Sequence, residues 1–294
     1  MPDFGIMRGF NDKLFGDKLV AGQLPTQLGL IGSLNISQLL LDLYPNAAAA
    51  YSVRKLRTAY TGNAIRVRRS SDNAESDIGF SGDNIDTATL TSFCSGTNGF
   101  VTTWYDQSGN GRNATQTTAG NQPQIVSSGS VILENGKPAL QFDGSNDGFA
   151  LSIPSPNSLG GGSEYSVISR TSSLNPIVTF NDGAASNMYS LWIFPALGWL
   201  SRFGTGFQNF GNPSTINQML VSINRKTSTT EMYRNNTLLG DLSNVSLSTN
   251  SFVSFGIGPQ ATNGKIQESV LYPSDQSANR TAVETNINTY YAIY

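Results

Sequence analysis

Two short segments carry side-chain oxygens at spacings that could bind a ligand or an ion. Asp143, Asn146 and Asp147 offer three oxygen ligands of the kind that Ca²⁺ prefers. No full loop of ligands follows them, so a structural turn is the favoured interpretation. Asp106 lies in the segment Tyr105–Gly111, where Asp, Ser and Asn side chains typically bond to their own backbone. We therefore predict turns at both places and no metal site.

The absence of histidine removes several classes of chemistry. The 294 residues contain no histidine and one cysteine, Cys94. Nucleophiles activated by imidazole, zinc held by histidine and histidine proton shuttles are thereby excluded. A single cysteine also excludes an intrachain disulfide and a cysteine-clustered metal site. We expect no cofactor.

The overall charge excludes two kinds of partner. Eighteen basic and 20 acidic residues give a net charge of −2, which predicts no nucleic-acid footprint. No run of 18 apolar residues occurs, so no membrane span is expected. The first residues show no secretory signal, which predicts a chain assembled in a host cytoplasm. Few charges and 30 glycines are typical of β-rich extracellular or virion proteins.

Residues 1–43 concentrate large apolar side chains in a stretch broken by glycine and proline. Such a stretch does not form one long helix, because interior glycine and proline cost about 1–3 kcal/mol each. It buries its side chains either on the following domain or on another subunit, and both alternatives stay open. We predict an attachment and oligomerisation arm whose contact residues are Leu14, Phe15, Leu19, Leu24, Leu28, Leu30 and Ile31.

Residues 44–294 have the pattern of an all-β sandwich with one helix at its N-terminal end and another at its C-terminal end. Pro45 and Asn46 ahead of Ala47–Ala50 predict a short N-terminal helix. The spacing of Val283, Ile287 and Tyr290 predicts a C-terminal helix over 278–291. Between them, short β-prone segments alternate with turn residues. The expected strands are 64–68, 100–105, 124–126, 139–142, 165–168, 177–180, 188–194, 219–224, 230–234, 253–257 and 265–271.

Six basic residues gather near the start of this domain: Arg54, Lys55, Arg57, Arg66, Arg68 and Arg69. Five acidic residues follow closely between positions 72 and 86. Pairing within the fold is therefore the favoured interpretation, and a phosphate-binding stripe is the alternative.

Several motifs resemble a known family. Three segments resemble the N-terminal part of the catalytic domain of the fungal α-L-arabinofuranosidase B family. They are Ala50–Gly62 (AYSVRKLRTAYTG), Phe93-Cys94-Ser95-Gly96 and Trp104–Gly111 (WYDQSGNG). The segments Ala139–Asp147 and Gly264–Tyr272 look like concanavalin A/laminin-G-like jelly rolls in general. The resemblance covers residues 45–294 and is most specific in the first hundred. It implies a two-sheet concanavalin A-like jelly roll.

The resemblance also indicates where catalytic carboxylates would lie. A retaining glycosidase needs two of them about 5 Å apart. Gln260, in the stretch Gly256–Ala261, occupies the position of the family's acid/base aspartate. An amide cannot donate a proton and take it back. The nucleophilic glutamate is expected in the middle strands, yet no Asp or Glu occurs between Asp182 and Glu231. We therefore predict no catalytic residues and no enzymatic activity.

The resemblance implies a cysteine pair as well. Cys94 matches one member, and Gly99 stands where its partner would be.

Aromatic residues supply the predicted carbohydrate contacts. Rings can stack on sugar C–H surfaces while amides orient the hydroxyls. Tyr189 and Trp192 lie three residues apart and cannot share a strand face. Burial of these rings between the sheets is the favoured alternative. If a groove exists, its residues are predicted to be Tyr189, Trp192, Trp199 and Gln260.

Taken together, these observations predict a non-enzymatic structural protein of a phage virion, such as a head-fibre, decoration or tail-associated subunit. The arm would dock on other virion subunits, the jelly roll would display a glycan-binding face to the host, and the chain would form a homo-oligomer, as a trimer. Two alternatives stay open: an active arabinofuranosidase-like glycoside hydrolase, and a carbohydrate-binding module of a bacterial surface protein.

Overall fold

The computed structural model describes residues 39–153, 162–170, 180–181, 188–194, 198–204, 206–209, 217–243, 252–255 and 262–294. The chain divides into two units, residues 1–38 and 39–294, and every described residue belongs to the second. The residues predicted for the attachment arm lie outside the described part of the chain: Leu14, Phe15, Leu19, Leu24, Leu28, Leu30 and Ile31.

Strands dominate the described residues, with a few short helices. The helices are α1 (Leu40–Leu43), α2 (Thr87–Phe93), the 3-10 turn η2 (Ala119–Asn121) and α3 (Arg280–Tyr291). The strands are β1 (Ala49–Ser52), β2 (Ile65–Arg69), β3 (Glu75–Ile78), β4 (Phe80–Ser81), β5 (Asn84–Ile85), β6 (Gly99–Trp104), β7 (Ala114–Thr115), β8 (Gln124–Ser127), β9 (Ser130–Val131), β10 (Leu133–Glu134), β11 (Lys137–Pro138), β12 (Leu140–Asp143), β13 (Phe149–Ile153), β14 (Gly162–Arg170), β15 (Phe180–Asn181), β16 (Met188–Phe194), β17 (Gly198–Gly204), β18 (Gly206–Asn209), β19 (Met219–Arg225), β20 (Thr229–Arg234), β21 (Thr237–Ser243), β22 (Phe252–Phe255) and β23 (Asn263–Tyr272).

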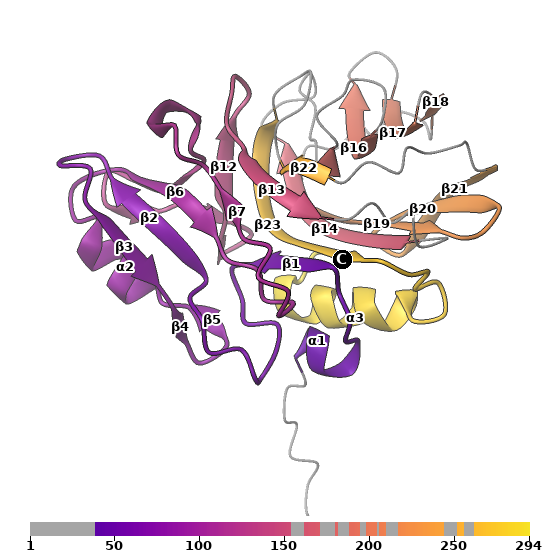
Figure 1. The fold of residues 1–294 in the computed structure, drawn as a ribbon, viewed down its shortest axis with the longest axis horizontal. Helices are drawn as coiled ribbons and strands as arrows, with labels where there is room; N and C mark the ends of the chain where they lie inside the picture. Colours follow the sequence, from indigo (N-terminus) through magenta and orange to yellow (C-terminus); the bar gives the residue numbers. More distant parts are fainter. Residues whose placement is uncertain are drawn as a thin grey trace, which may run out of the picture. The chain divides into compact units, whose positions relative to one another are not determined.

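These strands form an antiparallel sandwich. The long strand β14 lies between β19 and β23, and β23 also pairs with β1 and β12. Figure 1 shows β16, β17 and β22 in a layer that faces β14 and β19. All pairings recorded between described strands are antiparallel. The predicted all-β sandwich is confirmed at this level.

The expected strands 219–224 and 230–234 pair as a hairpin, and an asparagine turn follows it. Strands β19 and β20 pair with Asn224 opposite Glu231. Asn235 and Asn236 follow with φ values of 49° and 63°, in the left-handed region that asparagine tolerates. The Asn235 side chain also accepts a hydrogen bond of 2.9 Å from the backbone amide of Leu220. This turn joins β20 to β21.

The prediction of a helix beginning at Ala47 was wrong. Ala49–Ser52 forms β1, which pairs with Leu271–Glu268 of β23, and all four of its residues are buried. Alanine is a strong helix former, but burial on both faces of a sheet outweighs that local preference. The N-terminal helix, α1, lies earlier in the chain and has four residues.

The predicted C-terminal helix is confirmed as α3. Its buried stripe contains Val283, Ile287 and Tyr291, whereas Tyr290 is only partly buried. Figure 1 shows α3 alongside the sheet that contains β1, β14 and β23. No helix in the described ranges combines the length and the apolar character that a bilayer crossing requires.

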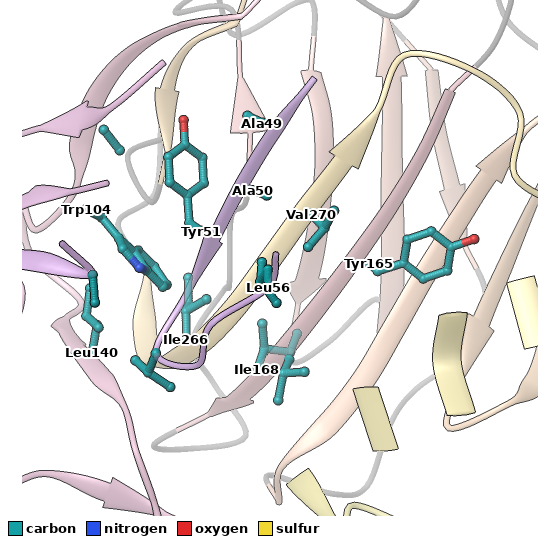
Figure 2. Packing of buried hydrophobic residues seen from close by; sticks show 14 of the residues in the cluster. Ala49, Ala50, Tyr51, Leu56, Trp104, Leu140, Tyr165, Ile168, Ile266 and Val270 are labelled. Carbon is teal, nitrogen blue, oxygen red and sulfur yellow. The ribbon is translucent and has the colours of Figure 1, made fainter. Parts of the chain in front are cut away.

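Aromatic rings from distant segments meet in the core (Figure 2). Tyr51 of β1 packs on Trp104 of β6 with ring centroids 5.9 Å apart, and Trp104 packs on Phe149 of β13 at 6.4 Å. All three are fully buried. The core therefore joins the N-terminal strands to the central ones.

A buried ion pair ties β1, β23 and α3 together. The Arg54 guanidinium donates from Nε to Glu268 Oε2 at 2.7 Å and from its second amino group to Oε1 at 2.9 Å. The two side chains are 5% and 0% exposed. Ser52 donates to the same carboxylate at 2.7 Å, and Arg54 also donates to Asn286 of α3 at 3.0 Å.

Tyr291 completes this cluster from α3. Its hydroxyl lies 3.2 Å from Glu268 Oε2 and 3.2 Å from the carbonyl of Gln267. Burial, and then the Glu268 carboxylate, raise the pKa of Tyr291 well above its usual range. The phenol therefore stays neutral and acts as a donor.

Other members of the basic cluster pair at the surface. Arg66 contacts Glu75 at 2.6 Å and Asp77 at 3.1 Å, and Arg69 contacts Asp72 at 2.7 Å. Pairing within the fold, the favoured interpretation of the cluster, is confirmed for these arginines.

The structure brings Cys94 and Gly99 into contact. Cys94 is buried and free, directly after α2, and Gly99 begins β6. A Cβ placed on Gly99 would lie 2.7 Å from the Cys94 Sγ and 3.1 Å from side-chain carbons of Val67 and Val126. In a disulfide, a Cβ lies about 3 Å from the partner's sulfur. The two positions therefore have the proximity that the resemblance implied for a cysteine pair.

We predict that Glu268→Gln destabilises the protein strongly, because it leaves the buried Arg54 charge without its counter-ion. The expected loss in free energy of unfolding is about 3–5 kcal/mol. The matched control is Glu75→Gln, which removes a surface partner of Arg66 and should cost less than about 1 kcal/mol. Urea unfolding followed by fluorescence measures both. Equal losses for the two variants would contradict this account of the ion pair.

We also predict that Gly99→Cys forms a disulfide with Cys94 under mild oxidation. Thiol titration should then find no free cysteine, and mass spectrometry should show the loss of two hydrogens. The control is Gly120→Cys, where an added Cβ meets nothing and both thiols should persist. Two titratable thiols in oxidised Gly99→Cys would show that the contact is not close enough to bond.

Candidate functional site

Asp106 stabilises a loop and offers no open ligand position. Its Oδ1 accepts hydrogen bonds from the amides of Ala50 and Ser108, both at 2.9 Å. Its Oδ2 accepts from Ser108 Oγ at 2.7 Å and from the amide of Arg112 at 3.0 Å. Four donors satisfy the carboxylate, so the predicted turn is confirmed here.

The neighbouring Gln107 is also structural. It is fully buried, and its side chain accepts from the amide of Leu56 at 2.8 Å and donates to the carbonyl of Arg54 at 3.0 Å. The Asp106-Gln107 pair therefore joins the loop after β6 to β1 and the segment that follows β1.

Asp143 and Asp147 form a turn after β12. Asp147 Oδ2 accepts from the amide of Asp143 at 2.9 Å, and Asp143 Oδ1 accepts from the amide of Ser145 at 2.8 Å. Within the described ranges, no group of three or more acidic, cysteine or histidine side chains is placed to hold a metal ion. The geometry supports the turn interpretation.

This turn also borders a cavity of about 210 Å³. Besides the two aspartates, its walls contain Phe100 of β6, Gln124 of β8, Gln141 of β12, and Ala119, Gly120 and Gln122 from the segment between β7 and β8. Sequence reasoning missed this cavity, because its residues come from three separate stretches of the chain and no motif connects them.

The Asp147 carboxyl group, in the wall of this cavity, has a raised pKa. Only 6% of the residue is exposed. Burial, and then the nearby Asp143 carboxylate, raise the pKa of Asp147 to about 6. A carboxyl group of this kind exchanges its proton near neutral pH.

The residues predicted to bind carbohydrate lie on β16, on β17 and outside the described part of the chain. Strand pairing places Trp199 opposite Ile193, and Trp192 opposite Leu200. By alternation, Tyr189 and Trp199 occupy positions on one face of this hairpin, and Trp192 a position on the other. Gln260 and the stretch 256–261 lie outside the described residues. The groove stays a prediction.

A buried carboxylate that sequence reasoning did not single out lies on β14. Glu164 is 2% exposed, and its Oε1 accepts from Ser166 Oγ at 2.9 Å. Ser166 in turn contacts Ser269 of β23 at 2.7 Å. Every residue of β14 is buried, so no alternation marks Glu164 in the sequence.

Comparison with known proteins relates this chain to glycoside hydrolases. Residues 42–139 match the family model "Alpha-L-arabinofuranosidase B, catalytic". A probable alpha-L-arabinofuranosidase B of Aspergillus flavus is 39% identical over 106 residues, covering 32% of this chain and 21% of the relative. A probable alpha-L-arabinofuranosidase B of Aspergillus fumigatus is 32% identical over 168 residues, covering 54% of this chain and 29% of the relative. The chain thus matches less than a third of either relative's length.

Solved structures show the same fold. A GH54 arabinofuranosidase soaked with a cyclic sulfate inhibitor superposes with a TM-score of 0.68 at 17% identity, over 84% of this chain and 64% of that chain. An arabinofuranosidase complexed with arabinofuranosyl-alpha-1,2-xylobiose gives 0.68 at 19% identity, with the same coverage.

These findings correct the prediction of a non-enzymatic phage virion subunit located in a virion. The similar proteins named above are arabinofuranosidases, those with a stated source are fungal, and the family model that matches residues 42–139 is that of a catalytic domain. The predicted lack of catalytic residues was drawn from Gln260 and from residues 182–231, which lie beyond the matched region 42–139. Missing acids in a diverged segment did not justify that conclusion. The chain is similar over residues 42–139 to the catalytic domain of the α-L-arabinofuranosidase B family, and it has the fold of GH54 arabinofuranosidases.

We predict that Asp147→Asn alters the pH dependence of stability. A folded pKa of about 6 lies above the ordinary 3.8, so the folded state binds the proton more tightly. The contribution of Asp147 to stability should therefore fall as pH rises from about 4 to about 6. Over that range, and after allowance for solvent screening, the variant should gain about 1–2 kcal/mol relative to the unsubstituted protein. Urea unfolding across a pH series measures the difference.

The control for this prediction is Asp72→Asn, which should behave in the opposite sense. A hydrogen bond from Arg69 lowers the pKa of Asp72, so this variant should lose stability relative to the unsubstituted protein as pH rises through the ordinary value of 3.8, with little further change above about pH 5. Parallel stability curves for Asp147→Asn and the unsubstituted protein would contradict the raised pKa.

Proposed function

We propose that this protein is a glycoside hydrolase of the arabinofuranosidase type, which removes α-L-arabinofuranosyl groups from larger saccharides. The observation that carries the proposal is the match of residues 42–139 to a catalytic-domain family model. The fold supports it, since 84% of the chain superposes on GH54 arabinofuranosidases. We further propose that the sandwich is a concanavalin A-like jelly roll, as the antiparallel neighbours of β14 and β23 suggest.

The proposed substrate contacts come from the β16–β17 hairpin and from the segment before β23. Tyr189 and Trp199 occupy positions on the same face of that hairpin, which suits a ring that stacks on a sugar. Gln260 is proposed to orient a hydroxyl through its amide. Trp192, at a position on the opposite face, is proposed to contribute less.

The reaction requires two carboxylates about 5 Å apart if the configuration at the sugar is retained. One carboxylate attacks the anomeric carbon while the other protonates the leaving oxygen and then activates water. Asp106 and Glu268 are unsuited to these roles, because four hydrogen bonds hold the first and an arginine neutralises the second. The pair is therefore to be found among the other acidic residues.

The deciding experiment measures turnover of a chromogenic aryl α-L-arabinofuranoside, followed by replacement of each Asp with Asn and each Glu with Gln. We expect turnover by the full chain, and two substitutions that lower kcat about a thousandfold or more with folding intact. Glu268→Gln and Asp106→Asn serve as controls. Because both carboxylates have structural roles, the main effect of each substitution should be on the free energy of unfolding and not on kcat.

Two further outcomes complete the test. Trp199→Ala should raise KM about five- to twentyfold with a smaller effect on kcat, since it removes a stacking surface. An absence of turnover on aryl and natural arabinofuranosides, with saccharide binding retained, would overturn the proposal in favour of a binding module.

A further inference from the structure

A row of side chains crosses four adjacent strands on one face of the sheet. Register places Phe100 of β6 opposite Gln124 of β8, Gln124 opposite Gln141 of β12, and Gln141 opposite Lys265 of β23. Directly opposed residues share a face, so these side chains stand side by side. Three of them, Phe100, Gln124 and Gln141, line the cavity of about 210 Å³.

This face is the one that points away from the hydrophobic core. Leu140 and Phe142, the neighbours of Gln141 along β12, are fully buried in the core cluster. Gln141 and Asp143 alternate with them and therefore lie on the opposite face. The cavity opens on that outer face, where both residues border it.

Two groups in the cavity wall retain hydrogen-bonding capacity. Asp147 is buried and accepts through Oδ2, but no described residue donates to its Oδ1. The Gln141 carboxamide, half-buried, makes no hydrogen bond with the described residues. A carboxylate oxygen and a carboxamide together offer acceptors and donors to a ligand.

The other walls are held in place. Gln122 is 4% exposed, accepts from Arg68 Nε at 2.7 Å and donates to the carbonyl of Gln116 at 3.0 Å. The Arg68 guanidinium lies 5.1 Å from the centroid of the Phe100 ring. These contacts orient one aromatic ring and one amide before any ligand arrives.

We propose that this cavity binds a single neutral sugar ring, as a saccharide-binding site that goes beyond the proposed hydrolytic function. Phe100 supplies an apolar surface for ring C–H groups, and Gln141 and Asp147 bond to the hydroxyls. An anion is disfavoured because Asp143 and Asp147 both border the cavity. A metal ion is disfavoured because only two acidic side chains meet there and the space is far larger than an ion needs.

The test titrates the full chain with L-arabinose, D-xylose and xylotriose. None of these contains an arabinofuranosidic bond, so loss of the proposed hydrolytic activity leaves this test intact. Binding is measured by calorimetry and by the shift of glutamine side-chain amide signals in NMR spectra. The Gln141 signal is identified by its disappearance in Gln141→Ala.

We expect at least one of these sugars to bind and to shift the Gln141 signal. Gln141→Ala and Phe100→Ala should each weaken binding tenfold or more, with an unchanged Tm for Gln141→Ala. The matched control is Gln276→Ala, a glutamine outside the cavity, which should leave affinity unchanged. Affinity unchanged in Gln141→Ala, or no sugar bound, would overturn the proposal. So would a Tm that rises with millimolar Ca²⁺ and not with any sugar.

Discussion

The structure depends on how one buried charge is neutralised. Arg54 follows β1 and lies in the interior, where an unpaired guanidinium would be very costly. Glu268 of β23 receives two of its donors, and Asn286 of α3 receives a third. Because Arg54 comes from the beginning of the domain and both partners come from its end, the charge can be satisfied only when β1, β23 and α3 have assembled.

The need to pair the buried Arg54 also explains the role of the Trp104–Gly111 motif. Asp106 and Gln107 belong to the segment that resembles the arabinofuranosidase B family, and the sequence predicts a turn there. In the fold, both side chains bond to backbone groups of β1 and of the residues up to Leu56. They hold the strand from which Arg54 reaches Glu268. The described contacts therefore give this pair a structural role in the scaffold.

The misassignment of function has a related cause. The positions that the resemblance indicates for catalytic carboxylates lie outside the matched residues 42–139, so the lack of acids at those positions does not imply a lack of activity. A carboxylate acts through its position in space, and several strands can deliver one to the same place. Glu164 illustrates this: it lies in a strand with no distinguishing pattern, yet it is buried among serines of β14 and β23.

Features that depend on neighbours in the chain could be predicted from the sequence alone. The β19–β20 hairpin, the Asn235-Asn236 turn and helix α3 follow from alternation, turn chemistry and helical spacing, which are local effects. Many of the expected strands match observed ones within one or two residues for the same reason.

The remaining features depend on contacts between segments that are distant in the chain, and these appear only in the folded structure. Ala49–Ser52 is a strand because β23 lies beside it, although its alanines favour a helix. The row of Phe100, Gln124 and Gln141 exists through strand register, which no short stretch encodes. The free energy of burial and pairing between remote residues exceeds the small local preferences that a sequence displays, and it therefore sets both the fold of β1 and the composition of the cavity.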